Sequence, residues 1–147
     1  MLQLKRLIYQ KLNLLSYSIH QSWQRAEYKL NKDLVTSSCE ACRADAPVLK
    51  NKEIQELLSQ IPSWRVFEED DTKKIICSFV FLNYDDSRNF LNKVADLADE
   101  EDHHPEIILE WGKVTVTWWS HKIKGLHKND FICASKTDAL FENLQKS

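Results

Sequence analysis

The residues of this chain that are best suited to chemistry are three histidines. His103 and His104 are adjacent, and His121 follows after an apolar run. An imidazole has an ordinary pKa of about 6.5, so it can donate or accept a proton near neutral pH. Nucleophilic catalysis has less support, because no serine elbow is visible and Cys77 and Cys133 lie in apolar runs typical of small buried side chains. The residue types therefore favour acid–base chemistry.

The spacing predicts that these histidines meet. Two strands are expected at residues 106–111 and 114–120, joined by a turn at Gly112. In an antiparallel hairpin the start of the first strand lies beside the end of the second. The adjacent histidines precede the first strand and His121 follows the second, so we expect them at one end of the sheet. Asp130, near the start of the last expected helix, is placed to orient or charge one imidazole.

A metal site is the main competitor for this cluster. Three histidines, or two with a carboxylate, are common ligand sets. Adjacent histidines diverge in an extended chain, however, and we expect no metal. Cys39 and Cys42 form a CxxC pair, which could be redox-active or half of a zinc site, but no second close pair follows. The alternative without chemistry is that the histidines are solvated or satisfied within the core.

The elements that position these residues alternate between helices and strand pairs. Their order predicts an α+β fold, in which a four-stranded antiparallel sheet carries helices on one face. Trp118 and Trp119 would point to opposite faces, which suggests self-association through the sheet. The expected helices are 52–61, 84–102 and 128–145, and the expected strand pairs are 64–68 with 73–82 and 106–111 with 114–120.

Two segments are expected along the chain, a basic amphipathic extension at 1–33 and a domain at 34–147. The extension places apolar residues at near-helical spacing among lysines and arginines. It could bind a partner or a membrane surface, act as a transit-like segment, pack on its own domain, or be an accessory extension. The sequence leaves these alternatives open.

The composition excludes several classes of protein. The chain has 147 residues with 20 Lys+Arg and 22 Asp+Glu, a net charge of −2, so it lacks the basic balance of a duplex-DNA-binding protein. No run approaches the ~18–20 apolar residues of a membrane span. With 2 glycines there is no glycine-rich phosphate loop. We therefore expect no nucleic-acid or membrane partner, and the few cysteines favour the reducing cytoplasm.

A multi-point pattern resembles the pterin-4a-carbinolamine dehydratases. It covers about residues 34–145 and leaves 1–33 unexplained. The segments 39–47 and 111–126 are similar to the bacterial branch of that family. The pattern itself consists of Asp99, then His103-His104-Pro105, an aromatic at Trp111, His121 and Asp130.

The resemblance implies a dehydratase that removes water from 4a-hydroxytetrahydropterin and yields quinonoid dihydropterin. This reaction serves tetrahydrobiopterin recycling for aromatic amino-acid hydroxylases, so a functional link to phenylalanine hydroxylase is expected. The pterin is the substrate, and no cofactor is implied. The family assembles as homodimers or homotetramers.

The resemblance also implies roles for individual residues. His103 and His121 would act as acid–base groups, His104 would bind and position the pterin, and Asp130 would support His121. The pocket would further be lined by Asp102, Trp119, Ser120 and Lys122.

A non-catalytic function is the alternative. Some members of this family resemble dimerisation cofactors of a homeodomain transcription factor, and the extension at 1–33 could serve as a partner helix. An enzyme would lose its function on replacement of His103 or His121 by alanine without loss of assembly. A partner-binding protein would instead be sensitive to truncation of residues 1–33 or to changes at the sheet edge.

Overall fold

The computed structural model describes residues 32–40 and 46–146. Most of the expected N-terminal extension, residues 1–31, lies outside the described part. The helices are α2 (Lys32–Thr36), α3 (Asn51–Leu58), α4 (Tyr84–Glu100) and α5 (Lys128–Gln145), and the strands are β1 (Arg65–Glu69), β2 (Thr72–Val80), β3 (Glu106–Glu110) and β4 (Lys113–Trp118).

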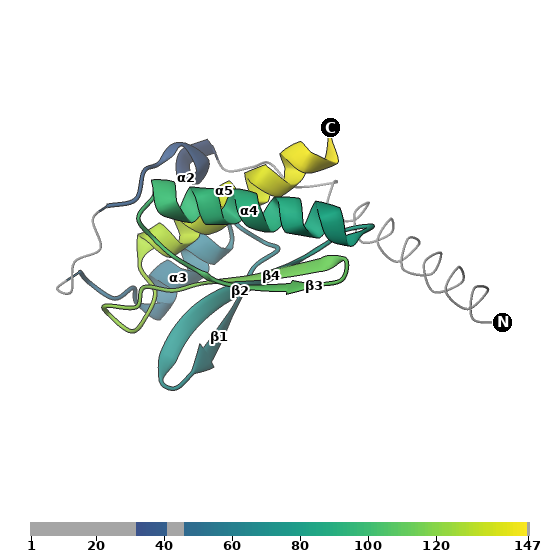
Figure 1. The fold of residues 1–147 in the computed structure, drawn as a ribbon. Coiled ribbons are helices and arrows are strands. Elements are labelled where there is room, and N and C mark those ends of the chain that lie inside the picture. Colours follow the sequence, from purple (N-terminus) through teal and green to yellow (C-terminus); the bar gives the residue numbers. More distant parts are fainter. Residues whose placement is uncertain (1–31, 41–45, 147) are drawn as a thin grey trace.

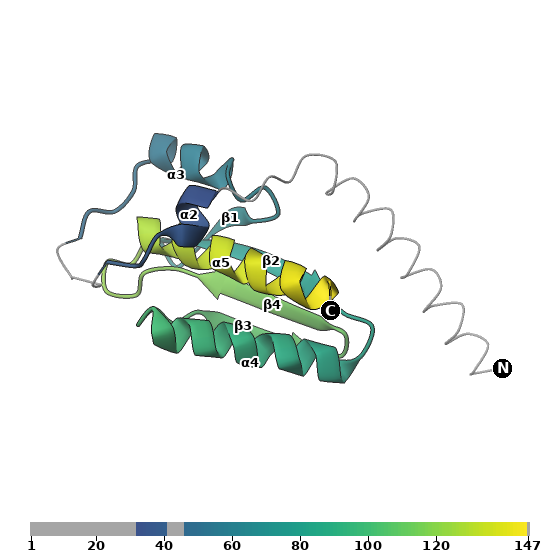
Figure 2. The ribbon, with the colours of Figure 1, turned by 90° about the horizontal axis from the view of Figure 1, so that it is seen from above.

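The four strands form one antiparallel sheet in the order β1-β2-β4-β3. Figure 1 shows the helices on one face of this sheet, and Figure 2, seen from above, shows α4 and α5 running side by side across it. The predicted α+β fold is therefore confirmed. The polar segment from residue 33 to about residue 50 is expected to form a loop or a short helical turn, and the structure has the short helix α2 at its start, with Leu34 buried in the core. No helix in the described ranges is both long and apolar enough to cross a membrane.

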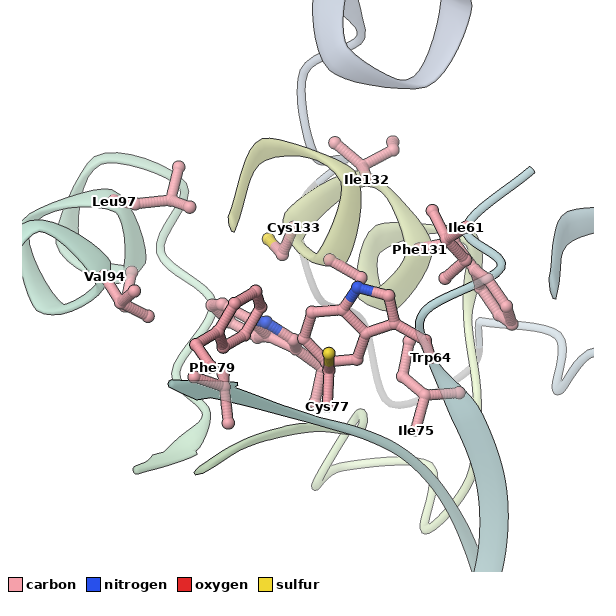
Figure 3. Packing of buried hydrophobic residues seen from close by; sticks show 14 of the residues in the cluster. Ile61, Trp64, Ile75, Cys77, Phe79, Val94, Leu97, Phe131, Ile132 and Cys133 are labelled. Carbon is pink, nitrogen blue, oxygen red and sulfur yellow. The ribbon is translucent and has the colours of Figure 1, made fainter. Parts of the chain in front are cut away.

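Alternation along β2 and β4 explains how the sheet builds the core. Ile75, Cys77 and Phe79 point toward the helices and are buried, and so are Val116 and Trp118 of the neighbouring strand (Figure 3). The register aligns these rows directly. Trp118 thus lies inside the domain, at the end of the sheet where the histidines gather.

The two long helices start at side-chain caps. The Asn83 side chain accepts a hydrogen bond from the backbone N–H of Asp86 at 2.8 Å and so caps α4. Helix α5 is capped by His127, whose Nδ1 accepts from the backbone N–H of Asn129 at 3.3 Å. The sequence suggests Lys128 or Asn129 near this start instead. A histidine cap fixes where α5 begins, and with it the position of Asp130.

Two turns set the ends of the elements. Helix α3 ends at Leu58 rather than at residue 61, because i→i−3 backbone bonds tighten the chain there. The β3–β4 turn is made by Trp111 and Gly112, and Gly112 has a φ of +67°. The Phe81 N–H donates to the Gly112 carbonyl at 2.8 Å. This contact joins the turn to the chain that leaves β2.

Candidate active site

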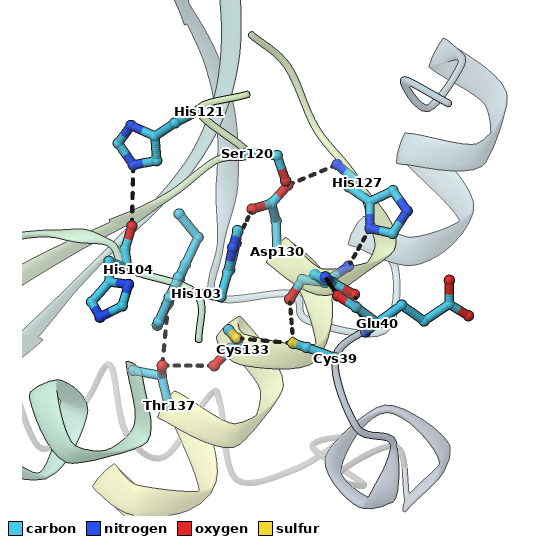
Figure 4. A network of polar contacts seen from close by, with 12 residues as sticks. Cys39, Glu40, His103, His104, Ser120, His121, His127, Asp130, Cys133 and Thr137 are labelled. Atoms are coloured by element: carbon cyan, nitrogen blue, oxygen red, sulfur yellow. Dashed lines mark hydrogen bonds and ion pairs between the residues drawn. The ribbon is translucent and has the colours of Figure 1, made fainter. Parts of the chain in front are cut away.

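The β3–β4 hairpin brings the predicted histidines to one end of the sheet. Glu106 pairs with Thr117, so the residues before β3 lie beside those after β4. The Nε2–H of His121 donates to the backbone carbonyl of His104 at 3.2 Å (Figure 4). A carbonyl can only accept, so Nε2 carries the proton and Nδ1 of a neutral His121 carries the lone pair. The exposed ring of His121 is therefore held against the backbone of His104, whose own side chain is also exposed.

His103 forms a buried pair with Asp130. Its Nε2 lies 2.6 Å from Oδ1 of Asp130, and the two residues are 3% and 0% exposed (Figure 4). The His103 ring stacks on Trp118 with a centroid distance of 5.5 Å and an interplanar angle of 11°. The carboxylate can stabilise positive charge on this imidazole within the protein interior.

Asp130 binds two further donors. The backbone N–H of His127 donates to Oδ2 at 2.7 Å, and the hydroxyl of Ser120 donates to the same oxygen at 3.2 Å. The expectation that Asp130 supports His121 is therefore wrong. Asp130 lies in the first turn of α5 and closes a capping box with His127, which turns its carboxylate back into the interior. His121 lies outside that interior, on the exposed side of Ser120.

His104 is held by a carboxylate of its own. Its Nε2 lies 3.1 Å from Oδ1 of Asp99, and both side chains are largely exposed. Asp99 belongs to the acidic run at the end of α4, where four acids oppose the helix dipole. Sequence reasoning gives Asp99 no role in the site beyond its place in the family pattern. Its position five residues before His104 on a helix end was the available signal.

An aromatic side chain borders His121 on its other side. The ring of Trp119 lies 4.2 Å from that of His121, and the Nζ of Lys74 lies 4.3 Å from the Trp119 centroid. Lys74 is paired with Glu69 at 2.7 Å. Trp119 thus provides a flat apolar surface next to an exposed imidazole.

The remaining residues of the predicted pocket lie in different surroundings. Asp102 is exposed with a φ of +48°, and Lys122 is exposed as well. Ser120 is buried and its hydroxyl is directed at Asp130. His127, which sequence reasoning left without a role, contributes its backbone to the same carboxylate. Its position three residues before Asp130 matches capping-box spacing and could have identified it.

The described residues contain no group of three or more His, Cys, Asp or Glu side chains arranged to hold a metal ion. The side chains at this end of the sheet that could bind a metal are instead hydrogen-bonded to one another or to the backbone. Each pair is a histidine with a carboxylate or a carbonyl, which is an arrangement suited to moving protons.

Comparison with known proteins places this chain in a family. The profile described as "Pterin 4 alpha carbinolamine dehydratase" matches residues 47–140, a range that includes Asp99, His104, His121 and Asp130. The chain belongs to this family.

Relatives of the family share about half of their residues with this chain. A protein of Nitrosococcus oceani, provisionally named a pterin-4-alpha-carbinolamine dehydratase, is 53% identical over 112 residues, which are 76% of this chain and 99% of that protein. A Photobacterium profundum protein with the same name is 56% identical over 104 residues, or 71% and 93% of the two chains. The crystal structure of a transcriptional coactivator/pterin dehydratase from Brucella melitensis superimposes with a TM-score of 0.59 at 28% identity and covers 65% of this chain and 99% of that one.

Proposed function

We propose that this protein dehydrates 4a-hydroxytetrahydropterin to quinonoid dihydropterin by histidine acid–base catalysis. The observation that carries the proposal is the contact between the exposed His121 ring and the His104 backbone, which anchors His121, with Trp119 packed against it, next to the chain that carries the exposed His104. Membership of the dehydratase family supports the choice of substrate.

The chemistry needs only proton transfers. A proton must reach the hydroxyl on C4a, the C–O bond breaks to release water, and a proton leaves N5 as the double bond forms. No electrons are exchanged with another molecule, so the pterin is the substrate and no further cofactor is needed. One imidazole that donates and one that accepts would complete the reaction.

The geometry favours His104 and His121 as the groups that contact the pterin. Both are exposed, and each is held through Nε2 by Asp99 or by a backbone carbonyl. His103 is buried with Nε2 on Asp130, so we propose that this pair fixes the chain behind the pocket and stabilises charge there. The assignment departs from the acid–base role that the resemblance implied for His103. Trp119 would stack on the flat pterin ring.

Stopped-flow dehydration of freshly generated 4a-hydroxytetrahydropterin tests the proposal. Wild type should accelerate the reaction, and His121→Gln and His104→Gln should each lower kcat/KM by about 10²–10⁴-fold, the usual contribution of a positioned acid or base. Lys93→Gln is the matched control, because this exposed residue lies on α4 away from the site. Wild type that leaves the spontaneous rate unchanged would overturn the enzymatic function. Acceleration retained in both histidine variants would overturn the assignment of roles.

We propose that this dehydration serves tetrahydrobiopterin recycling in the cytoplasm. The quinonoid product is an oxidised pterin, so a reductase must consume it, and an aromatic amino-acid hydroxylase such as phenylalanine hydroxylase would supply the carbinolamine. The support for this setting is the family alone. The corresponding measurement is the level of carbinolamine-derived by-products in cells that lack the protein. We expect these by-products to accumulate.

We further propose that the chain assembles as a homodimer or homotetramer through the sheet. The face opposite the helices exposes Val80 of β2 (43%) and Ile108 of the edge strand β3 (47%). Light scattering should give a mass above that of one 17.3 kDa chain. The Ile108→Lys variant should shift that mass downward, because a buried unpaired charge opposes association.

Partner binding is the second candidate function, because the related Brucella melitensis protein is described both as a transcriptional coactivator and as a pterin dehydratase. The two functions separate cleanly in the variants. If partner binding is the function, His104→Gln and His121→Gln should retain it, whereas removal of residues 1–33 should abolish it.

A further inference from the structure

The CxxC pair is the motif that the proposed reaction does not use. The structure describes Cys39 and places its sulfur 3.5 Å from the sulfur of Cys133 in α5 (Figure 4). Cys133 is fully buried and Cys39 is half-buried. The two thiols are far apart in the sequence and come from different parts of the fold. Cys77, the other described cysteine, is buried in β2.

We propose that Cys39 and Cys133 form a reversible disulfide, which ties the segment after α2 to helix α5 when the protein meets a peroxide. This inference goes beyond the proposed dehydration and does not depend on it. Disulfides in reducing compartments are usually transient and redox-sensing, so a reversible bond is the appropriate kind.

The approach of the two sulfurs is fixed by the backbone around Cys39. The amide of Asn129 binds Glu40 twice, accepting from its N–H at 3.1 Å and donating to its carbonyl at 2.7 Å. The N–H of Cys39 donates to Oε2 of Glu101 at 2.9 Å. These bonds hold the segment on the first turn of α5. The sulfurs need to move together by only about 1.5 Å to reach the ~2.05 Å bond length of a disulfide.

The hydrogen bonds assign different roles to the two thiols. The Cys39 thiol donates to the carbonyl of Asn129 at 3.8 Å, so in the contact between the sulfurs Cys133 is the donor. The hydrogen bond with Cys39, together with burial, raises the pKa of the Cys133 thiol. Cys133 therefore stays protonated and out of reach of solvent. Cys39 is the sulfur that an oxidant can reach.

The oxidation balances with hydrogen peroxide as the named oxidant. The Cys39 thiolate attacks one peroxide oxygen, an S–O bond forms, the O–O bond breaks, and the hydroxide that leaves takes up a proton to give water. The Cys133 sulfur then attacks the resulting sulfenic acid, the S–S bond forms, and the S–O bond breaks. The departing hydroxide takes the Cys133 proton and leaves as a second water. Two thiols lose two electrons and two protons, and one peroxide becomes two waters.

The test is to map disulfides in the full chain after peroxide treatment. Remaining thiols are alkylated, and the protein is digested without reductant by trypsin and by a protease that cuts after glutamate. Cleavage after Glu40 separates Cys39 from Cys42, so mass spectrometry can distinguish their bonds. We expect a peptide that joins Cys39 to Cys133 and that disappears on treatment with dithiothreitol.

Matched variants identify the pair. Cys39→Ser and Cys133→Ala should each abolish the linked peptide, whereas Cys42→Ser and Cys77→Ala should retain it. Cys39→Ser removes a half-buried thiol, so it keeps the test valid even if Cys133→Ala folds poorly. Oxidation should also raise Tm by at least about 5 °C in wild type and in Cys42→Ser, because the bond closes a long loop in the unfolded chain.

Two results would overturn the proposal. One is a disulfide confined to Cys39 and Cys42, and the other is oxidation of Cys39 to sulfinic acid with no link to Cys133. Neither readout involves the pterin, so failure here is distinguishable from failure of the proposed dehydratase function.

Discussion

Asp130 shows how a single buried carboxylate can be tolerated and used. It is fully buried, and its two oxygens accept from the imidazole of His103, the backbone of His127 and the hydroxyl of Ser120. Burial of an unpaired charge would be costly, but three donors and a partner able to carry positive charge offset that cost. The same contacts fix the orientation of His103 under the candidate pocket.

At this scale, Asp130→Asn should destabilise the protein by about 2–4 kcal/mol. The substitution replaces one carboxylate oxygen by an NH2 group, which cannot accept a hydrogen bond, so buried donors lose their partner. Chemical denaturation at pH 7 measures the change. Ser120→Ala is the control, since it removes only the 3.2 Å bond and should cost about 1 kcal/mol. Equal losses in the two variants would contradict the importance of the His103 pair.

Residue types and spacing predicted the candidate site better than they predicted its pairings. The convergence of His104 and His121 followed from the hairpin, since antiparallel pairing is set by the chain. The sequence did not predict that Asp130 contacts His103 rather than His121. The capping-box spacing of His127 and Asp130 is visible in the sequence, but the burial of His103 against Trp118 is decided only when the helix packs on the sheet.

At the scale of the elements, the β3–β4 turn depends on one glycine. Gly112 has a φ of +67°, and a Cβ there would lie 2.9 Å from the carbonyl oxygen of Phe81. Gly112→Ala should therefore lower the free energy of unfolding by about 1–3 kcal/mol. Gly125→Ala is the control, because its close neighbour at 2.9 Å is a side-chain methyl group of the exposed Val48, which can shift, rather than a backbone oxygen, and because no positive φ is involved. Thermal unfolding of both variants measures the difference, and a larger loss at Gly125 would contradict the argument.

The end of α4 is tied to α5 by an ion pair between Glu101 and Lys136. Burial alone would raise the pKa of Glu101, but hydrogen bonds from Lys136 and Cys39 outweigh it and lower this pKa below its ordinary 4.5. A carboxyl with a lowered pKa stabilises the fold above its unfolded pKa. That stabilisation is lost as the pH falls through the folded value.

Glu101→Gln should therefore be less stable than wild type at pH 7 by roughly 1–3 kcal/mol. The difference should shrink as the pH falls below the ordinary pKa of 4.5 and through the lower folded value, because wild type then loses the same charge. Denaturation curves across this range test the sign. Glu110→Gln is a control on an exposed pair with Lys113, and it should show little change at any pH. A gap between Glu101→Gln and wild type that widens in acid would contradict the linkage.

The long, periodic elements were predictable and the short ones were not. Helix α5 begins and ends at the expected residues, because its length and apolar spacing outweigh local detail. Helix α2 has only five residues, too few for a periodic signal, and packing of Leu34 stabilises it. The last turn of the expected helix 52–61 is replaced by tight backbone turns, which the residue types do not distinguish from helix.

At the scale of the whole molecule, an aromatic cluster joins the sheet to both long helices. Phe90 of α4 is fully buried, and its ring lies 4.8 Å from that of Phe79, 5.2 Å from Phe81 and 5.8 Å from Phe141 of α5. Phe79, the member of the cluster that comes from β2, lies among the buried residues between the sheet and the helices (Figure 3). It connects every layer that positions the candidate site.

Phe90→Ala should consequently destabilise the domain by about 3–5 kcal/mol, the usual cost of a cavity at a buried aromatic residue. One cooperative transition in urea, with a lower midpoint and an unchanged slope, is the expected measurement. Phe67→Ala is the comparison, because this half-buried residue of β1 lies outside the cluster, and its loss should be clearly smaller. Similar midpoints for the two variants would contradict a single shared core.

The groups proposed to carry or support proton transfer all lie between Asp99 and Asp130, on the end of one helix, one hairpin and the start of the next helix. Strands β1 and β2 and helix α3 provide none of them. A recombination event with breakpoints on either side of residues 99–130 would therefore transfer all of these groups together to a hybrid protein. The residues outside this stretch can then vary in sequence, provided that they still pack against residues 99–130 in the same way.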